Sequence, residues 1–212
     1  MASRLRVNPL RRHKERGNTF VEFALVVVAV TPFIFGLLAM GITLGRSIQA
    51  ANVTRDVGHM YALSADFSTQ PARDIVAKLA EDFDLDPTSG TAVLILSRIS
   101  IVAPVDCVPI GAACNNRGLP VVTQRLVIGN TSLHASEFAT PPTGTVDAKG
   151  DVAGLTYMDQ PALVAAGFQN VLALSGNDQA WVVEGFFKQP DLNFLTPGFA
   201  AANEGTYVRS IF

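Results

Sequence analysis

The sequence predicts an α+β protein: a long N-terminal transmembrane helix continues into a head with a second short helix and an antiparallel sheet of about four strands. Three observations predict this fold. Residues 23–45 carry no charge, apolar residues after Pro71 recur at helical spacing, and four later segments alternate like strands between turn residues. We expect a basic segment over residues 1–17, the long helix over 18–65 and the head over 66–212.

Composition excludes several classes of protein. The chain has 212 residues, of which 49% are hydrophobic and 16% charged, so it is not largely disordered. Two cysteines exclude a four-thiolate zinc module. A net charge of −2 lacks the excess of basic residues that is typical of nucleic-acid-binding proteins. Residues 1–17 hold six Lys or Arg and one acid, which leaves ten basic and 17 acidic residues for the remainder. A basic N-terminal segment therefore precedes an acidic body.

The uncharged run of residues 23–45 fits a membrane span. As a helix it would be about 35 Å long, enough to cross about 30 Å of hydrocarbon with a modest tilt. A buried core helix is the alternative, but such helices rarely lack a polar face. The run is too long for a cleaved secretory signal. Because basic flanks stay in the cytoplasm, we expect the head to lie across the membrane.

The border between basic segment and span carries the functional signal. It reads Gly17-Asn18-Thr19-Phe20-Val21-Glu22. A glycine lets the backbone lie extended in a protease cleft, so we expect cleavage between Gly17 and Asn18. A carboxylate within a span is costly unless it has a partner. Cleavage would create one, the new amino group of Asn18, and this pair could set the register of packed helices. Alternatively, Glu22 lies among headgroups at a helix start.

These residues resemble the class III signal of type IV pilin-like proteins. More narrowly, the first 60 residues resemble the TadE-like family of minor pilins or pseudopilins from tight-adherence (Flp) pilus systems. The matching features are Arg16-Gly17, the Val-Glu-Phe-Ala-Leu of residues 21–25, Pro32, and the Leu-Gly-Arg of residues 44–46. Residues 181–187 (Trp-Val-Val-Glu-Gly-Phe-Phe) and 195–197 (Leu-Thr-Pro) are similar to the C-terminal strands of such proteins, less specifically.

The resemblance implies a function and a location. It implies that prepilin peptidase cuts after Gly17, and that the partners are other pilin-like subunits, a pilus assembly platform and the lipid bilayer. It also implies a single pass through a bacterial inner membrane, with the N-terminus cytoplasmic and the head periplasmic, or extracellular in a pilus. We expect no cofactor, no metal, no nucleic-acid partner and no enzymatic activity.

Three residues of the span have candidate roles in helix shape and packing. Pro32 removes one backbone hydrogen bond, so we expect a kink, although membrane helices also tolerate proline. Gly41 and Gly45 form a small-xxx-small pair that allows close packing of helices. Such pairs are also common by chance in apolar segments.

Beyond Arg46 the long helix continues as an amphipathic one. Asn52, Arg55 and His59 fall on its wet face, where we expect His59 to be solvated. The opposite face is the apolar stripe that we expect to pack on the head; it consists of Ala50, Val53, Val57, Met60, Tyr61 and Ser64.

The second helix opens at Pro71 and ends in an acidic segment. Its apolar face holds Ala72, Ile75, Val76, Leu79 and Phe83. The triplet Asp82, Asp84 and Asp86 is similar to the start of a calcium loop, but Pro87 stands where the glycine belongs and Val93 where the late Glu belongs. A solvated acidic turn is the preferred interpretation.

Four strand-like segments follow, and we expect their apolar face to pack on the two helices. The last segment covers residues 206–212. In the other three, the residues expected to share a face are Val93, Ile95, Ile99 and Ile101; Val122, Leu126 and Ile128; and Trp181, Val183 and Phe187.

Two further features lie in the head. Cys107 and Cys114 can pair in an exported domain and close a short loop, the alternative being two free thiols. Residues 130–160 read as a long loop that contains His134 and Glu137. No nucleophile elbow, phosphate loop or HExxH motif surrounds these two, so neither a catalytic triad nor a metal site is supported.

Three hypotheses remain from the sequence. The first is a minor pilin-like subunit that is trimmed at Gly17 and contributes to the assembly, initiation or tip of an adherence pilus. The second is a signal-anchored binding module outside the cytoplasm that never enters a filament. The third, an anchored enzyme, has no motif in its favour.

Overall fold

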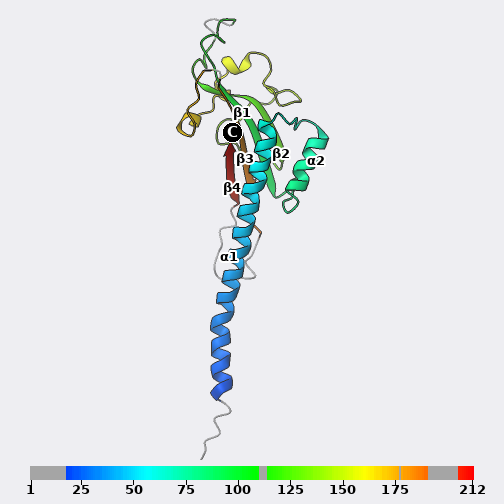
Figure 1. Cartoon of the computed structure of the whole chain (residues 1–212), viewed down its shortest axis with the longest axis vertical. Helices are drawn as coiled ribbons and strands as arrows, with labels where there is room; N and C mark the ends of the chain where they lie inside the picture. The colour runs from blue at the N-terminus through cyan, green and yellow to red at the C-terminus, as the bar shows by residue number, and fades with distance from the viewer. Residues whose placement is uncertain (1–17, 110–113, 177, 191–204) are drawn as a thin grey trace, which may run out of the picture. The chain divides into compact units, whose positions relative to one another are not determined.

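The computed structural model describes residues 18–109, 114–176, 178–190 and 205–212. These residues form two compact units, one with residues 18–42 and the other with 43–190 and 205–212. The predicted fold class is confirmed: one long helix, one short helix and a four-stranded antiparallel sheet (Figure 1). Membrane insertion and the location of the head remain predictions.

Helix α1 spans Asn18–Ala62 and is the one helix in the described part that is long and apolar enough to cross a membrane. It ends three residues before the predicted end, and Ser64 then takes a left-handed conformation with φ 67°. Helix α2 spans Gln70–Leu79, with Pro71 in its first turn as predicted. It ends before Phe83, and Ile75 and Leu79 of the predicted apolar face are exposed, so that part of the prediction was wrong.

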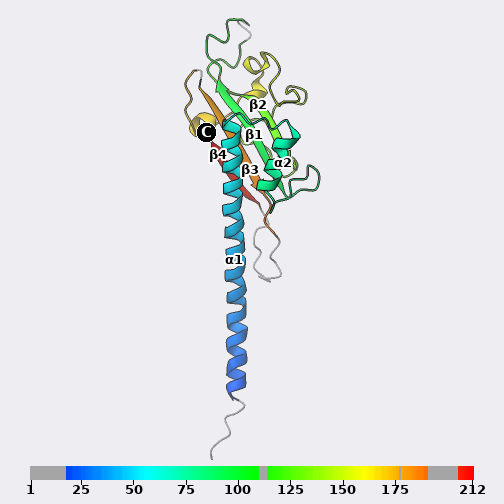
Figure 2. The ribbon, with the colours of Figure 1, turned by 45° about the vertical axis from the view of Figure 1, so that its right-hand side comes forward.

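The sheet has the order β2-β1-β3-β4, and every neighbouring pair is antiparallel (Figure 2). The strands are β1 (Ala92–Ile101), β2 (Pro120–Gly129), β3 (Gln179–Phe187) and β4 (Thr206–Ile211). The β1–β2 register shifts between Arg98 and Ile99, because Thr123 is an extra residue in β2. Short 3-10 helices at Thr156–Met158, Pro161–Leu163 and Phe168–Asn170 interrupt the connection from β2 to β3.

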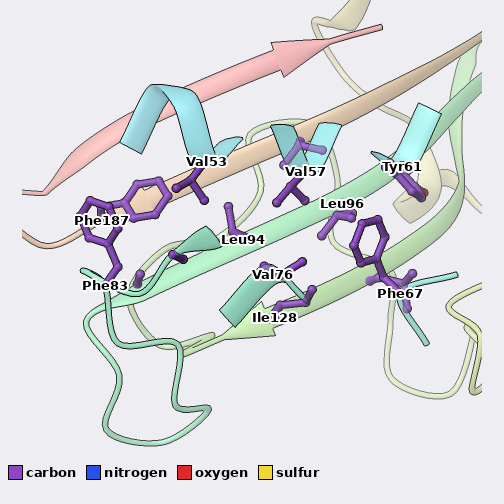
Figure 3. Close-up of a cluster of buried hydrophobic side chains, with 14 of the residues drawn as sticks. Val53, Val57, Tyr61, Phe67, Val76, Phe83, Leu94, Leu96, Ile128 and Phe187 are labelled. Atoms are coloured by element: carbon purple, nitrogen blue, oxygen red, sulfur yellow. The ribbon is translucent and has the colours of Figure 1, made fainter. Parts of the chain in front are cut away.

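One face of the sheet, called here the helix face, packs on α1 and α2. Figure 3 shows Val53 and Val57 of α1 and Val76 of α2 pointing at Leu94 and Leu96 of β1. Gly185 permits this close approach, since a Cβ there would lie 2.5 Å from Thr54 Oγ1. The prediction that Val93, Ile95, Ile99 and Ile101 share one face of β1 is confirmed, but the prediction that this face packs on the two helices was wrong. Val93, Ile95, Ile99 and Ile101 alternate with Leu94 and Leu96 and lie on the opposite side.

The opposite face, called here the loop face, is covered by the connection from β2 to β3. Ile99, Val122 and Val182 pack there on Phe138 and Phe168. The predicted grouping of Val122 with Leu126 and Ile128 was wrong, because those two residues belong to the helix face. The bulge at Thr123 separates them and reverses the alternation. The grouping on β3 is confirmed: Trp181, Val183 and Phe187 all pack in the helix-face core.

The amphipathic half of α1 has the predicted faces with one exception. Ala50, Val53, Val57 and Tyr61 are buried and Met60 is partly buried, whereas Asn52, Arg55 and His59 are exposed. Ser64 is also exposed, because the helix has ended before it. The stripe fixes this half of α1 to the sheet.

Candidate functional site

Asn18 of the predicted processing site and the nearby Glu22 belong to α1. Gly17 is outside the described residues, and the described helix starts at the next residue, Asn18. Glu22 follows one helical turn later and is exposed. Among the described side chains, none forms an ion pair with Glu22. The carboxylate is therefore open to a cation that the described part of the chain does not supply.

The large apolar side chains of α1 between Thr19 and Ile42 are exposed in the described structure, whereas the small Ala39 is buried. Examples are Val28, which is 72% exposed, and Phe33, which is 68% exposed. Helix α1 continues through Pro32. A Cβ at Gly41 or Gly45 would meet no atom within 4 Å in the described structure, so both positions are open to a neighbour. Such a surface suits lipid or another apolar helix.

The head contains a buried carboxylate that sequence reasoning missed. Glu184 of β3 is 1% exposed and lies on the loop face. It accepts hydrogen bonds from Ser136 Oγ at 2.5 Å, from the Glu137 amide at 2.9 Å and from the Tyr207 hydroxyl at 2.8 Å. A buried carboxylate is stable only when it is paired and hydrogen-bonded in this way. Glu184 thereby joins β3, β4 and the segment after β2.

A guanidinium and an imidazole lie in the same region of the loop face. Arg125 is buried and donates to the Ala139 carbonyl at 2.5 Å; burial lowers its pKa, which the charge of Glu184 partly opposes. His134 stacks on Phe186 and packs against Tyr207. Burial, and then the charge of Glu184, raise the pKa of the Tyr207 hydroxyl. These contacts hold the C-terminal strand in place and form no nucleophile–base pair.

The cysteines and the acidic triplet have structural partners. A disulfide joins Cys107 and Cys114. Asp86 accepts four hydrogen bonds from Thr88 and Ser89, whereas Asp82 accepts one from Gln49. The Asp84 carboxylate accepts a hydrogen bond from the backbone amide of Asp86. The carboxylates are engaged separately, and no metal-binding group of His, Cys, Asp or Glu occurs in the described part of the chain.

Among the described residues of the head, two open clefts are of a size to hold a ligand. The larger, about 1000 Å³, lies between Arg46, the acidic segment after α2, and Lys188. The smaller, about 620 Å³, lies on the helix face beyond the end of α1 and is lined by Arg98, Asp106, Asp151, Tyr157 and Gln179. Arg98 donates to Asp151 at 3.0 Å within it. Neither cleft contains a residue of the predicted processing or assembly site.

Comparisons with known protein families, with curated proteins and with solved structures found no match. Of the segments that carry the TadE-like resemblance, residues 181–187 form most of β3, while Gly17 and residues 195–197 lie outside the described residues.

Proposed function

We propose that this chain is a minor pilin-like (pseudopilin) subunit that contributes to the assembly, initiation or tip of a Flp-type adherence pilus. The observation that carries the proposal is the coincidence at one border: a basic segment ends at Gly17, and Glu22 stands five residues later in an apolar helix whose large side chains are exposed. Prepilin peptidase removes the basic segment in this account.

Cleavage supplies the cation that Glu22 lacks. The new amino group of Asn18 and the Glu22 carboxylate are four residues apart, a rise of about 6 Å along one face of a helix. In a low-dielectric bundle, the ammonium can pair with Glu22 of its own or a neighbouring chain. The ammonium and the carboxylate of neighbouring chains can meet only when the two helices are shifted along their axes by one particular distance. Their pairing therefore sets the register between subunits. The exposed positions at Gly41 and Gly45 allow the neighbouring helices to approach closely.

The topology follows from charge. The basic segment of residues 1–17 stays in the cytoplasm, residues 23–45 cross the inner membrane, and the head lies in the periplasm until it enters a filament. Partners are prepilin peptidase, other pilin-like subunits and the assembly platform. Since the head forms most of the chain, the subunit suits a component used in small numbers better than a repeating filament unit.

One observation favours a second candidate, a membrane-anchored binding module. The 620 Å³ cleft has a polar lining with an arginine, two carboxylates and an amide, and its size suits a small ligand. Under this alternative the anchor serves only as a tether, and Glu22 has no role beyond the membrane interface.

Replacement of Glu22 separates the two candidates. Under the pilin proposal, Glu22→Ala and Glu22→Gln still insert, because the apolar run drives insertion, but recovery of the chain with sheared pili falls at least tenfold. Glu22→Asp is the matched control and retains most assembly, since it keeps the charge. Unchanged recovery of Glu22→Ala in pili, or absence of the wild-type chain from them, contradicts the proposal. Gel analysis of membrane and pilus fractions reports both quantities.

A further inference from the structure

The two edges of the sheet are finished differently. Strand β2 is one edge, and the connection to β3 pairs with the first part of its outer side. Arg125 donates to Gly150 at 2.7 Å, Val152 to Thr123 at 2.9 Å and Ala165 to Pro120 at 2.8 Å. The bulge at Thr123 also disrupts this edge. Covering strands and bulges are ways in which proteins prevent unwanted pairing at an edge.

Strand β4 is the other edge, and none of the described segments pairs with its outer side. Trp181 and Phe212 exchange both backbone hydrogen bonds, so residues 206, 208, 210 and 212 point their backbone groups at β3. The N–H and C=O groups of Tyr207, Arg209 and Ile211 therefore point away from the sheet. None of them bonds to any residue in the described ranges. Three consecutive outward positions can pair with an added strand.

The β4 edge is held in place before any partner arrives. The Tyr207 hydroxyl is bound to buried Glu184, and Thr206 lies 3.3 Å from Ser47 of α1. The one charged residue of β4, Arg209, places its guanidinium over the ring of Phe138, 5.0 Å from its centroid. The strand has no lysine or proline, the residues that commonly guard an edge. A rigid, unguarded edge loses little entropy when a strand is added.

The direction of β4 decides which partner fits. Ser47 contacts Thr206 at one end of β4, and His59 stacks on Phe212 at the other, 5.3 Å between ring centroids. Strand β4 therefore runs in the same direction as residues 47–59 of α1. A second copy that added its own β4 antiparallel would have its α1 reversed, with the two Thr43 ends at opposite ends of the pair. Two chains joined at Thr43 to spans in one membrane do not fit that arrangement.

We propose that the outer edge of β4 binds an extended segment of a different pilin-like subunit by strand addition. This inference rests on the proposed function. Backbone groups of Tyr207, Arg209 and Ile211 supply the pairing. The added strand carries a carboxylate opposite Arg209, because opposite charges across neighbouring strands are favourable, and apolar residues beside Ile211. The added segment can run in either direction, since it is not tied to the direction of a copy of α1.

A proline at one outward position tests the proposal. Arg209→Pro removes an N–H that points away from β3 and leaves the bonds of Val208 and Ser210 to β3 intact, so the edge strand tolerates it. The matched control is Arg209→Ala, which keeps the N–H. We expect both full-length variants to insert and to be trimmed at Gly17. Recovery with the other subunits in sheared pili should fall at least tenfold for Arg209→Pro and less than threefold for Arg209→Ala.

Hydrogen exchange gives a readout that does not depend on how the proline variant folds. In the wild-type chain extracted in detergent, the amides of Tyr207, Arg209 and Ile211 should exchange at least tenfold faster than in the chain recovered with pili. Equal exchange in the two samples, or assembly of Arg209→Pro at the wild-type level, overturns the proposal. A Ser210→Cys variant that forms disulfide-linked dimers of identical chains overturns the choice of partner. Loss of trimming at Gly17 contradicts the proposed function instead.

Discussion

The two halves of α1 are apolar for different reasons. From Thr19 to Ile42, large apolar side chains are exposed all round, as at Val28 and Phe33. From Ala50 to Ala62 the apolar residues form one stripe, and Val57 and Tyr61 are buried against the sheet while Asn52 and Arg55 are exposed. In the described structure the large side chains of the first half are open to lipid or other helices, whereas the stripe of the second half packs on its own head. One continuous helix thus couples an environment outside the chain to a folded domain.

The sharpest way to break this comparison is a charge in the buried stripe. Val57→Asp places a carboxylate where Val57 is fully buried in the hydrophobic core of the helix face. We expect it to destabilise the head by about 4 kcal/mol or more, with insertion unchanged. Urea unfolding followed by tryptophan fluorescence measures the effect. Asn52→Asp, on the exposed face, is the control and should unfold like the wild type; equal stability of the two variants would refute the assignment of faces.

A charge in the first half should have the converse effect. Ile34→Arg places a guanidinium at the middle of residues 23–45, at a cost of about 3 kcal/mol for insertion, while the head remains folded. Ile48→Arg is the matched control, because Ile48 is an exposed apolar residue of the same helix outside residues 23–45. The fraction resistant to alkaline extraction reports insertion. If both variants insert equally well, residues 23–45 are not the span.

Reduction of the disulfide should affect the head alone. Cys107 and Cys114 close an eight-residue loop, for which the chain-entropy estimate is about 2.5 kcal/mol. We expect a reductant, or the pair Cys107→Ser and Cys114→Ser, to lower the urea midpoint by a corresponding amount without changing membrane association. A midpoint that does not move would show that the loop contributes nothing to the stability of the head.

The smallest effect concerns alkaline pH. Burial raises the pKa of Tyr61, whose hydroxyl donates to Gln124 Oε1 at 2.8 Å. The pKa of Tyr61 in the folded state exceeds the unfolded value near 10. The stability that the neutral Tyr61 hydroxyl contributes is therefore complete below pH 10 and is lost as the pH rises above it. We therefore compare the free energies of unfolding of Tyr61→Phe and the wild type at pH 8 and at pH 11. The advantage of the wild type over the variant should be about 1 kcal/mol smaller at pH 11 than at pH 8. Parallel urea titrations at the two pH values measure this; an unchanged difference would place Tyr61 in contact with water.

Local patterns in the sequence predicted the elements of the fold well. Periodicity among neighbouring residues is enough to predict the buried stripe on α1 and the shared face of Trp181, Val183 and Phe187. In the same way, Pro71 alone indicates the first turn of α2. Strand β1 is different: residues 92–96 are apolar at every position, because both faces of the sheet are covered. Alternation could not show which face meets the helices.

Features that depend on distant residues were missed. The bulge at Thr123 has no glycine or proline to signal it, and it reversed the expected face of Val122. The partners of Glu184 lie 48 and 23 residues away, at Ser136 and Tyr207. An acid inside an apolar strand, Val-Val-Glu-Gly-Phe, was the available signal for a buried network. The candidate processing site, in contrast, could be read entirely from adjacent residues.

The most direct test of the account is the N-terminus of the protein extracted from the membranes of its native host. Intact mass and N-terminal sequencing together identify it. We predict a chain that begins at Asn18, with a free amino group able to neutralise Glu22. A mature chain that still begins at Met1 would contradict the proposal, because Glu22 would then lack the ammonium group on which the register of packed subunits depends.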